Sequence, residues 1–76
     1  MLPLVTDFKH DEQVSRQRAA EHLVDIAYAL TAGGALELRA RGTGVKVPVP
    51  DRVVLKRESR SNGECVEVEV VLTWSA

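Results

Sequence analysis

The feature that most constrains the fold is the alternation of apolar and polar residues in the second half of the chain. Nine of the twelve valines lie after Gly44, and valine recurs at every second position from Val66 to Val70. A period of two is that of a strand, in which successive side chains point to opposite faces of a sheet. The second half is therefore expected to form strands, each with one apolar and one polar face.

The first half contains a segment with helical periodicity. Ser15 is expected to cap this helix, because its hydroxyl can accept a hydrogen bond from a backbone N–H two or three residues further on. The Gly33-Gly34 pair is expected to end it, since glycine adopts the left-handed C-cap conformation without steric strain. We therefore predict a helix over residues 15–32. Its apolar stripe is formed by Ala19, Leu23, Ile26, Ala27 and Leu30.

A hairpin is predicted directly after the helix. Apolar residues occupy alternate positions on both sides of the sequence Gly42-Thr43-Gly44, namely Leu36, Leu38 and Ala40 before it and Val45, Val47 and Val49 after it. A two-residue turn at 42–43 is expected to be of type II′, and it pairs Arg39 with Lys46, which are like charges. Pro48 and Pro50 have no N–H to donate, so the second strand is expected either at a sheet edge or to pair fully on one side only near its start.

A second hairpin is predicted over residues 53–74. Asn62-Gly63 is a strong signal for a two-residue type I′ turn, which pairs Leu55 with Val70. The same turn places Glu58 opposite Glu67, an unfavourable pair of like charges, so a longer loop remains an alternative. The apolar side of the last strand is formed by Val66, Val68, Val70, Leu72 and Trp74.

Together these segments predict one α+β domain over residues 1–76. A short N-terminal strand is expected over residues 4–9. The helix is expected to pack across one face of a four- to five-stranded antiparallel meander sheet, so that Leu55 and Val68 point toward Leu23. A chain of 76 residues has only a thin aliphatic core, so we expect it to self-associate as a homodimer.

Composition argues against several functional classes. A formal net charge of −1 gives no overall attraction to nucleic acid or to an anionic membrane. The single cysteine, Cys65, has no partner for an internal disulfide, and no Cys/His cluster has the spacing of a zinc site, so we expect no metal, no cofactor and a cytoplasmic location. Neither an export leader nor a run of the ~20 apolar residues of a membrane span is recognised.

No residue pattern predicts catalysis. His10, His22 and Cys65 are the candidates for a nucleophilic pair, but nothing in their spacing brings them together. Glu67 and Glu69 share a strand face about 7 Å apart, yet an open sheet surface offers no cleft in which a substrate would be held between them. Residues 42–44 lack the Lys and the following helix of a phosphate-binding loop. We therefore expect a protein that is not an enzyme, with hydrolysis or redox chemistry at Cys65 as the weakest alternative.

The most informative surface is the outward face of the predicted sheet. On it, basic residues lie on neighbouring strands and grade into Glu67 and Glu69 on the last strand. This grading is expected either from ordinary cross-strand charge pairing or from a docked partner. The predicted partner-binding residues are Arg39, Arg41, Lys46, Lys56 and Trp74. Trp74 is expected to cap the core, to act as an aromatic anchor in an interface, or both. The leading hypothesis is a non-enzymatic binding or accessory module. The alternative is a nucleic-acid-associated regulator that uses this basic patch, although the face has no aromatic residue on which a base would stack.

Several motifs in combination resemble the amphi-Trp domain family of small bacterial and archaeal proteins. They are the sequence Val14–Ala20, the Gly33-Gly34 break, the sequence Val47–Asp51 and an amphipathic last strand closing on Trp74. The resemblance extends from about residue 8 to residue 74 and implies no activity, because none is assigned to the family. Two departures concern charge. Arg18 stands at a helical position that is often acidic in the family, and Cys65, Val71 and Thr73 stand where outward acidic residues are more typical.

Overall fold

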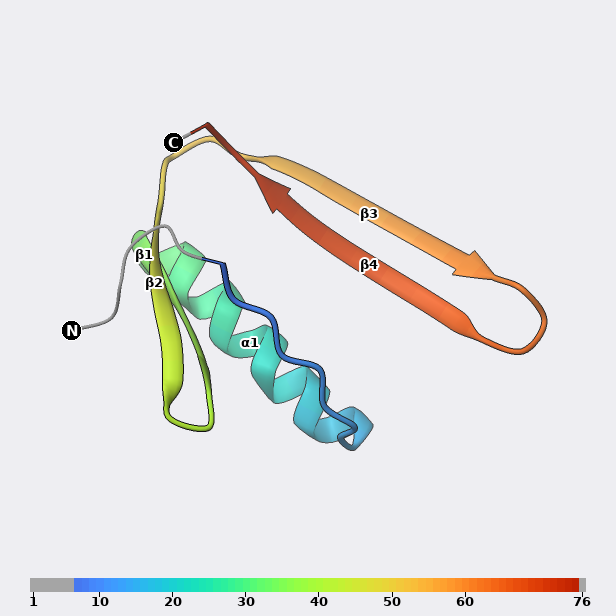
Figure 1. Ribbon diagram of the computed structural model, residues 1–76. Coiled ribbons are helices and arrows are strands. Elements are labelled where there is room, and N and C mark those ends of the chain that lie inside the picture. Colours follow the sequence, from blue (N-terminus) through green and yellow to red (C-terminus); the bar gives the residue numbers. More distant parts are fainter. Residues whose placement is uncertain (1–6, 76) are drawn as a thin grey trace.

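The computed structural model describes residues 7–75, which contain one helix followed by four strands (Figure 1). The elements are α1 (Arg16–Ala32), β1 (Gly34–Ala40), β2 (Thr43–Val49), β3 (Val54–Ser61) and β4 (Val66–Thr73). The predicted α+β class, with the helix before the strands, is confirmed.

Helix α1 begins and ends where its capping residues predict. The Ser15 hydroxyl accepts a hydrogen bond from the N–H of Arg18 at 3.0 Å. At the other end Gly33 adopts a φ of 83° and donates its N–H to the carbonyl of Ala29 at 3.1 Å. Each contact satisfies a backbone group that the helix leaves without an internal partner. Within residues 7–75, no helix has the length and apolarity needed to cross a membrane.

The hairpin β1–β2 is formed as predicted, but its register is two residues away from the predicted one. The turn is at Arg41 and Gly42, whose positive φ values of 48° and 82° are those of a type I′ turn. Glu37 therefore lies opposite Lys46, and the predicted pair of Arg39 with Lys46 is wrong. The observed register replaces a repulsion between like charges by an attraction.

Gly44 makes this register sterically feasible. It lies opposite Arg39, and a Cβ atom at Gly44 would be 2.6 Å from the carbonyl oxygen of Leu38. Only glycine fits such a close approach. Gly44, which lies next to the predicted turn in the sequence, is thus required within strand β2.

The hairpin β3–β4 also differs from its predicted register by two residues. Its loop comprises residues 62–65, in which the Asn62 side chain accepts hydrogen bonds from the N–H groups of Glu64 at 3.1 Å and Cys65 at 2.9 Å. The longer-loop alternative is therefore the correct one. Leu55 pairs with Leu72 rather than with Val70. Because the shift is by two residues, every side chain keeps its predicted face.

The four strands form two separate two-stranded sheets, β1–β2 and β3–β4, so the predicted single meander sheet is not confirmed. A physical reason lies in β2. Pairs in an antiparallel ladder alternate, and the tight turn makes the closing pair of Ala40 and Thr43 a hydrogen-bonded one. The backbone of Pro48 then faces the outer edge of β2, where its missing N–H removes a donor at the position where β3 would begin to pair.

The predicted N-terminal strand falls partly outside the described residues. Of residues 4–9, only 7–9 are described, and they are not in a strand. The polypeptide continues as irregular backbone to the start of α1. The expected fifth strand therefore has no counterpart among residues 7–75.

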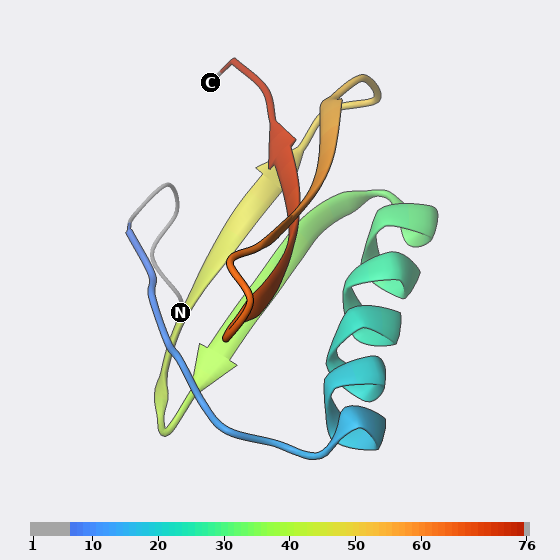
Figure 2. The same cartoon turned by 90° about the vertical axis from the view of Figure 1, so that its right-hand side faces the viewer.

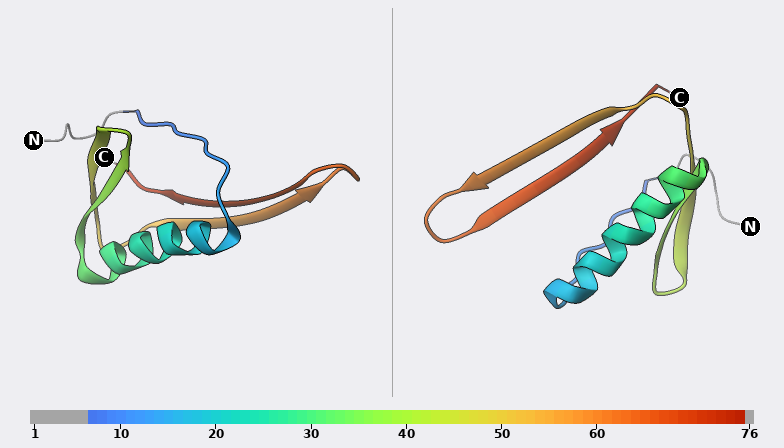
Figure 3. Two further views of the ribbon diagram at one scale, coloured as in Figure 1. Left: turned by 90° about the horizontal axis from the view of Figure 1, so that it is seen from below. Right: turned by 180° about the vertical axis from the view of Figure 1, so that it is seen from behind.

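The small core lies between α1 and the sheet β1–β2. Leu36 and Val45 are its buried residues, and α1 contributes half-buried Ala19, Ile26 and Ala29. Helix α1 runs beside β1, whereas the hairpin β3–β4 projects away from this body (Figures 1, 2 and 3). The Cα radius of gyration is 13.9 Å, compared with about 11 Å for a compact domain of this length. The molecule is therefore an open arrangement of a body and an arm.

The N-cap gives a stability prediction. Ser15→Ala removes the acceptor for the Arg18 N–H and is expected to lower the free energy of unfolding by about 1 kcal/mol, whereas Ser15→Asn keeps an acceptor and is expected to change it by a few tenths. Urea titrations at one fixed protein concentration measure both values. Equal losses in the two variants would contradict a capping role for this side chain.

Candidate interaction surface

The projecting hairpin β3–β4 carries a network of ion pairs on one face. Lys56 Nζ lies 3.1 Å from Glu58 and 4.0 Å from Glu69. Arg60 contacts Glu58 at 2.8 Å and Glu69 at 3.6 Å, and it also pairs with Glu67, directly opposite on β4. We call these five residues the charged face. Its two cations lie between three carboxylates, which explains how Glu58 and Glu69 can face each other across the ladder.

The opposite face of this hairpin carries a stripe of apolar side chains, nearly all of them on β4. We call it the apolar stripe, formed by Leu55, Val66, Val68, Val70 and Leu72. Val66 is 78% exposed and Val68 is 74% exposed, so the stripe is open to solvent along much of its length. Contiguous exposed apolar surface of this kind is typical of an interaction site.

Helix α1 does not cover the apolar stripe. We predicted that Leu55 and Val68 would point toward Leu23, but Leu23 is itself 60% exposed. Contacts of α1 with the strands are made mainly with β1. The expectation that one helix would close over one continuous sheet therefore fails at this arm.

The predicted basic patch is divided between two hairpins, and two of its four cations, Arg39 and Lys56, are in ion pairs. Arg39 forms an ion pair with Glu37 at 3.0 Å, and Lys46 lies opposite the same carboxylate. Lys56 belongs to the charged face of the other hairpin. Arg41 lies in the β1–β2 turn rather than on a strand face. The predicted grading of charge across one sheet is therefore absent from the described residues, and with it the like-charge pair that suggested a bound partner.

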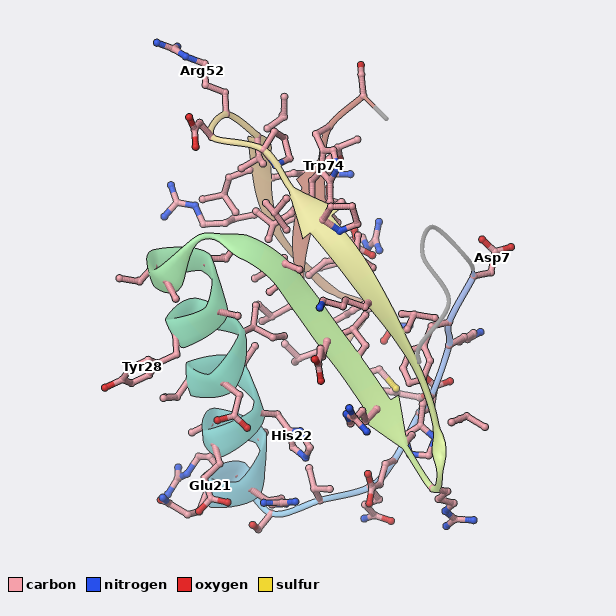
Figure 4. All side chains as sticks on the ribbon, turned by 90° about the vertical axis from the view of Figure 1, so that its left-hand side faces the viewer. Asp7, Glu21, His22, Tyr28, Arg52 and Trp74 are labelled. Atoms are coloured by element: carbon pink, nitrogen blue, oxygen red, sulfur yellow. The ribbon has the colours of Figure 1, made fainter. Side chains whose placement is uncertain are left out.

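Trp74 directly follows β4 and is half-buried. Its segment returns to the connection between β2 and β3, at the base of the projecting hairpin (Figures 1 and 4). The predicted apolar parity places it in line with Val70 and Leu72. Trp74 therefore lies just beyond the end of the apolar stripe, where the arm joins the body.

An open groove of about 840 Å³ lies between α1 and β1. His10 and His22 contribute to its lining, and His22 points from α1 toward β1 (Figure 4). Cys65 lies elsewhere, exposed in the β3–β4 loop. The structure therefore does not bring together the cysteine and histidines considered as a nucleophilic pair. Over the described part of the chain, no three metal-ligating side chains gather at one point.

The exposure of the apolar stripe is the feature that sequence reasoning missed. Parity correctly assigned these residues to one face, but parity does not say whether anything covers that face. The available signal was the pair Pro48 and Pro50, which restricts pairing along the outer edge of β2. If no strand can pair with this edge, the last two strands must be separate from the first two.

Comparison with known proteins identifies a family but no individual relative. The family model of the Amphi-Trp domain matches residues 2–76. No curated protein matches the chain, and no solved structure does.

The charged face gives a second stability prediction. Arg60→Gln removes the cation that pairs with Glu58, Glu67 and Glu69, and it is expected to lower the free energy of unfolding at low salt by up to about 1 kcal/mol. The difference should shrink at high salt, because ions screen exposed charges.

The matched control is Arg57→Gln, since Arg57 lies on the same strand but faces the opposite side, across from Val70. Urea titration at two salt concentrations measures both variants. A salt-independent loss for Arg60→Gln, or an equal salt-dependent loss for Arg57→Gln, would contradict the network.

Proposed function

The chain belongs to the Amphi-Trp domain family, and we propose that it is a non-enzymatic binding module that associates with a second copy of itself through the apolar stripe. The proposal rests on the exposure of this stripe on a projecting arm. A partner surface is the simplest means of removing these side chains from water, and burying a valine or leucine contributes about 1.5–3 kcal/mol.

The total accessible surface supports self-association. The chain exposes 6920 Å², about half as much again as the roughly 4,600 Å² expected for a folded monomer of this mass. The excess is of the order of 2,300 Å² per copy. Permanent homodimers bury about 2,000–5,000 Å² in total, so an excess on two copies is of the size that such an interface covers.

The small core supports the same proposal. Leu36 and Val45 are the buried apolar residues among those described, whereas a single core in a chain this short rarely supplies more than about 3–5 kcal/mol even when well formed. An additional interface would supply the missing burial. Self-association would therefore contribute to folding as well as to function.

The nucleic-acid alternative has less support. Among the predicted basic residues, Arg39 and Lys56 are already paired with carboxylates, and Lys46 faces Glu37. Nucleic-acid affinity depends on cations free to neutralise phosphates. The apolar stripe is therefore better suited to a protein partner with an apolar contact surface than to a nucleic acid.

A charge placed in the apolar stripe tests the proposal. Val68→Lys should raise the dissociation constant of the dimer at least about 100-fold, because an unpaired ammonium would have to be buried. Val54→Lys is the matched control, since Val54 has a similar exposure of 67% but points to the side of the charged face. It should change the constant less than about threefold.

Sedimentation equilibrium over a wide range of protein concentration measures both constants. The proposal fails if the unsubstituted chain stays monomeric at high micromolar concentration. It also fails if Val54→Lys weakens association as much as Val68→Lys does.

A further inference from the structure

We infer that the two copies meet edge to edge, with the outer edge of β4 hydrogen-bonded antiparallel to the outer edge of β4 in the second copy. This inference rests on the self-association proposed above and specifies its geometry. The product is a four-stranded sheet that crosses the dimer, with the two β4 strands at its centre and the two β3 strands outside.

The first argument is that β4 presents the least protected strand edge. Strand edges are normally blocked by proline, by charged side chains and especially lysine, or by a covering element. The charges on β4 are limited to Glu67 and Glu69. Pro48 blocks the edge of β2, and α1 lies along β1. Strand β3 carries three cations, whereas β4 has the sequence Val66–Thr73 without proline, lysine or arginine. Its only hydrogen-bonded neighbour among the described strands is β3.

The second argument concerns the backbone groups along this edge. The Asn62 N–H donates to the carbonyl of Cys65 at 3.2 Å, which fixes the alternation of the ladder from the loop onward. Arg60 and Glu67 then form a hydrogen-bonded pair, and Ser61 and Val66 do not. It follows that the N–H and C=O groups of every second residue point to the free edge. These residues are Val66, Val68, Val70 and Leu72.

The third argument is that the apolar side chains are distributed unequally between β3 and β4. On the face of the apolar stripe, β4 contributes valine and leucine, but β3 contributes Arg57, Ser59 and Ser61 opposite three of them. The stripe therefore runs along the outermost strand of each hairpin. Joining two copies through β4 brings the two stripes side by side in the middle of the new sheet, where the adjoining flanks of their side chains cover each other from water. The polar residues of β3 are left at the borders of this sheet.

The charges on β4 select the register. Centring the pairing on position 67, 68 or 69 would place a glutamate of one copy opposite a glutamate of the other, which is unfavourable. Centring it on Val70 avoids every such pair while keeping the longest overlap. Val70 then faces its own equivalent, Val68 faces Leu72, and Val66 faces Trp74. The half-buried tryptophan thus acquires an apolar cross-strand neighbour in the second copy.

Cysteine cross-linking tests this geometry. In a Cys65→Ser background, Val70→Cys places two thiols across the symmetry axis, where paired Cα atoms are about 5.5 Å apart and a disulfide can form. Val66→Cys is the matched control on the same face, and it is the more exposed site. Its two copies would be separated by about 27 Å along the strands. Under mild oxidation, Val70→Cys should give a covalent dimer and Val66→Cys should not.

The outcomes separate this inference from the proposal on which it rests. If both variants still associate but Val70→Cys fails to cross-link, the edge geometry is overturned and self-association stands. If both variants cross-link equally, the strands are not antiparallel about Val70, and the inference is again overturned. If neither the variants nor the unsubstituted chain associates, the proposed function fails, and the inference fails with it.

The native thiol provides a measurement that needs no substitution. A spin label attached to Cys65, which is exposed, would report a Cα separation of about 34 Å between the two copies in the inferred register. Pulsed dipolar spectroscopy measures this distance. A main distance below 20 Å would rule out the register centred on Val70.

Discussion

The absence of one backbone donor, at Pro48, is the constraint on which the arrangement depends. Because this proline faces the outer edge of β2, β3 cannot begin an unbroken ladder where a meander would require it to. The last two strands pair with each other instead and form an arm with no hydrogen bonds to the first sheet. The exposed apolar stripe, the large accessible surface and the small core all follow from this separation.

The sequence predicts local structure well because its signals are local. Ser15 and Gly33 fix the ends of α1, and strand parity assigns each side chain to the correct face in both hairpins. The registers are each wrong by two residues for particular reasons. Arg41 adopts a positive φ that sequence preference assigns to glycine. Asn62 closes a four-residue loop with both its side chain and its backbone N–H, instead of occupying a two-residue tight turn.

The candidate site could be predicted only in part, since its chemistry depends on which charges lack an ion-pair partner and which apolar face lacks a covering element. Parity identifies the residues of the apolar stripe, and the same rule places Lys56 and Glu69 on one face. Which carboxylate neutralises each cation depends on register, so the sequence alone could not place Glu37 beside Arg39 or Glu58 beside Lys56 within the predicted basic patch. Whether a face is covered depends on contacts between elements, to which a single sequence gives few signals.

The central claim is that burial of the apolar stripe requires a second copy, and the dependence of thermal stability on protein concentration tests it most directly. If folding is coupled to association, the unfolding midpoint must rise steadily as the concentration of the unsubstituted chain increases a hundredfold, because mass action favours the folded dimer. A midpoint that stays constant over that range would mean that the stripe is covered within one copy or tolerated in water, and it would contradict the account.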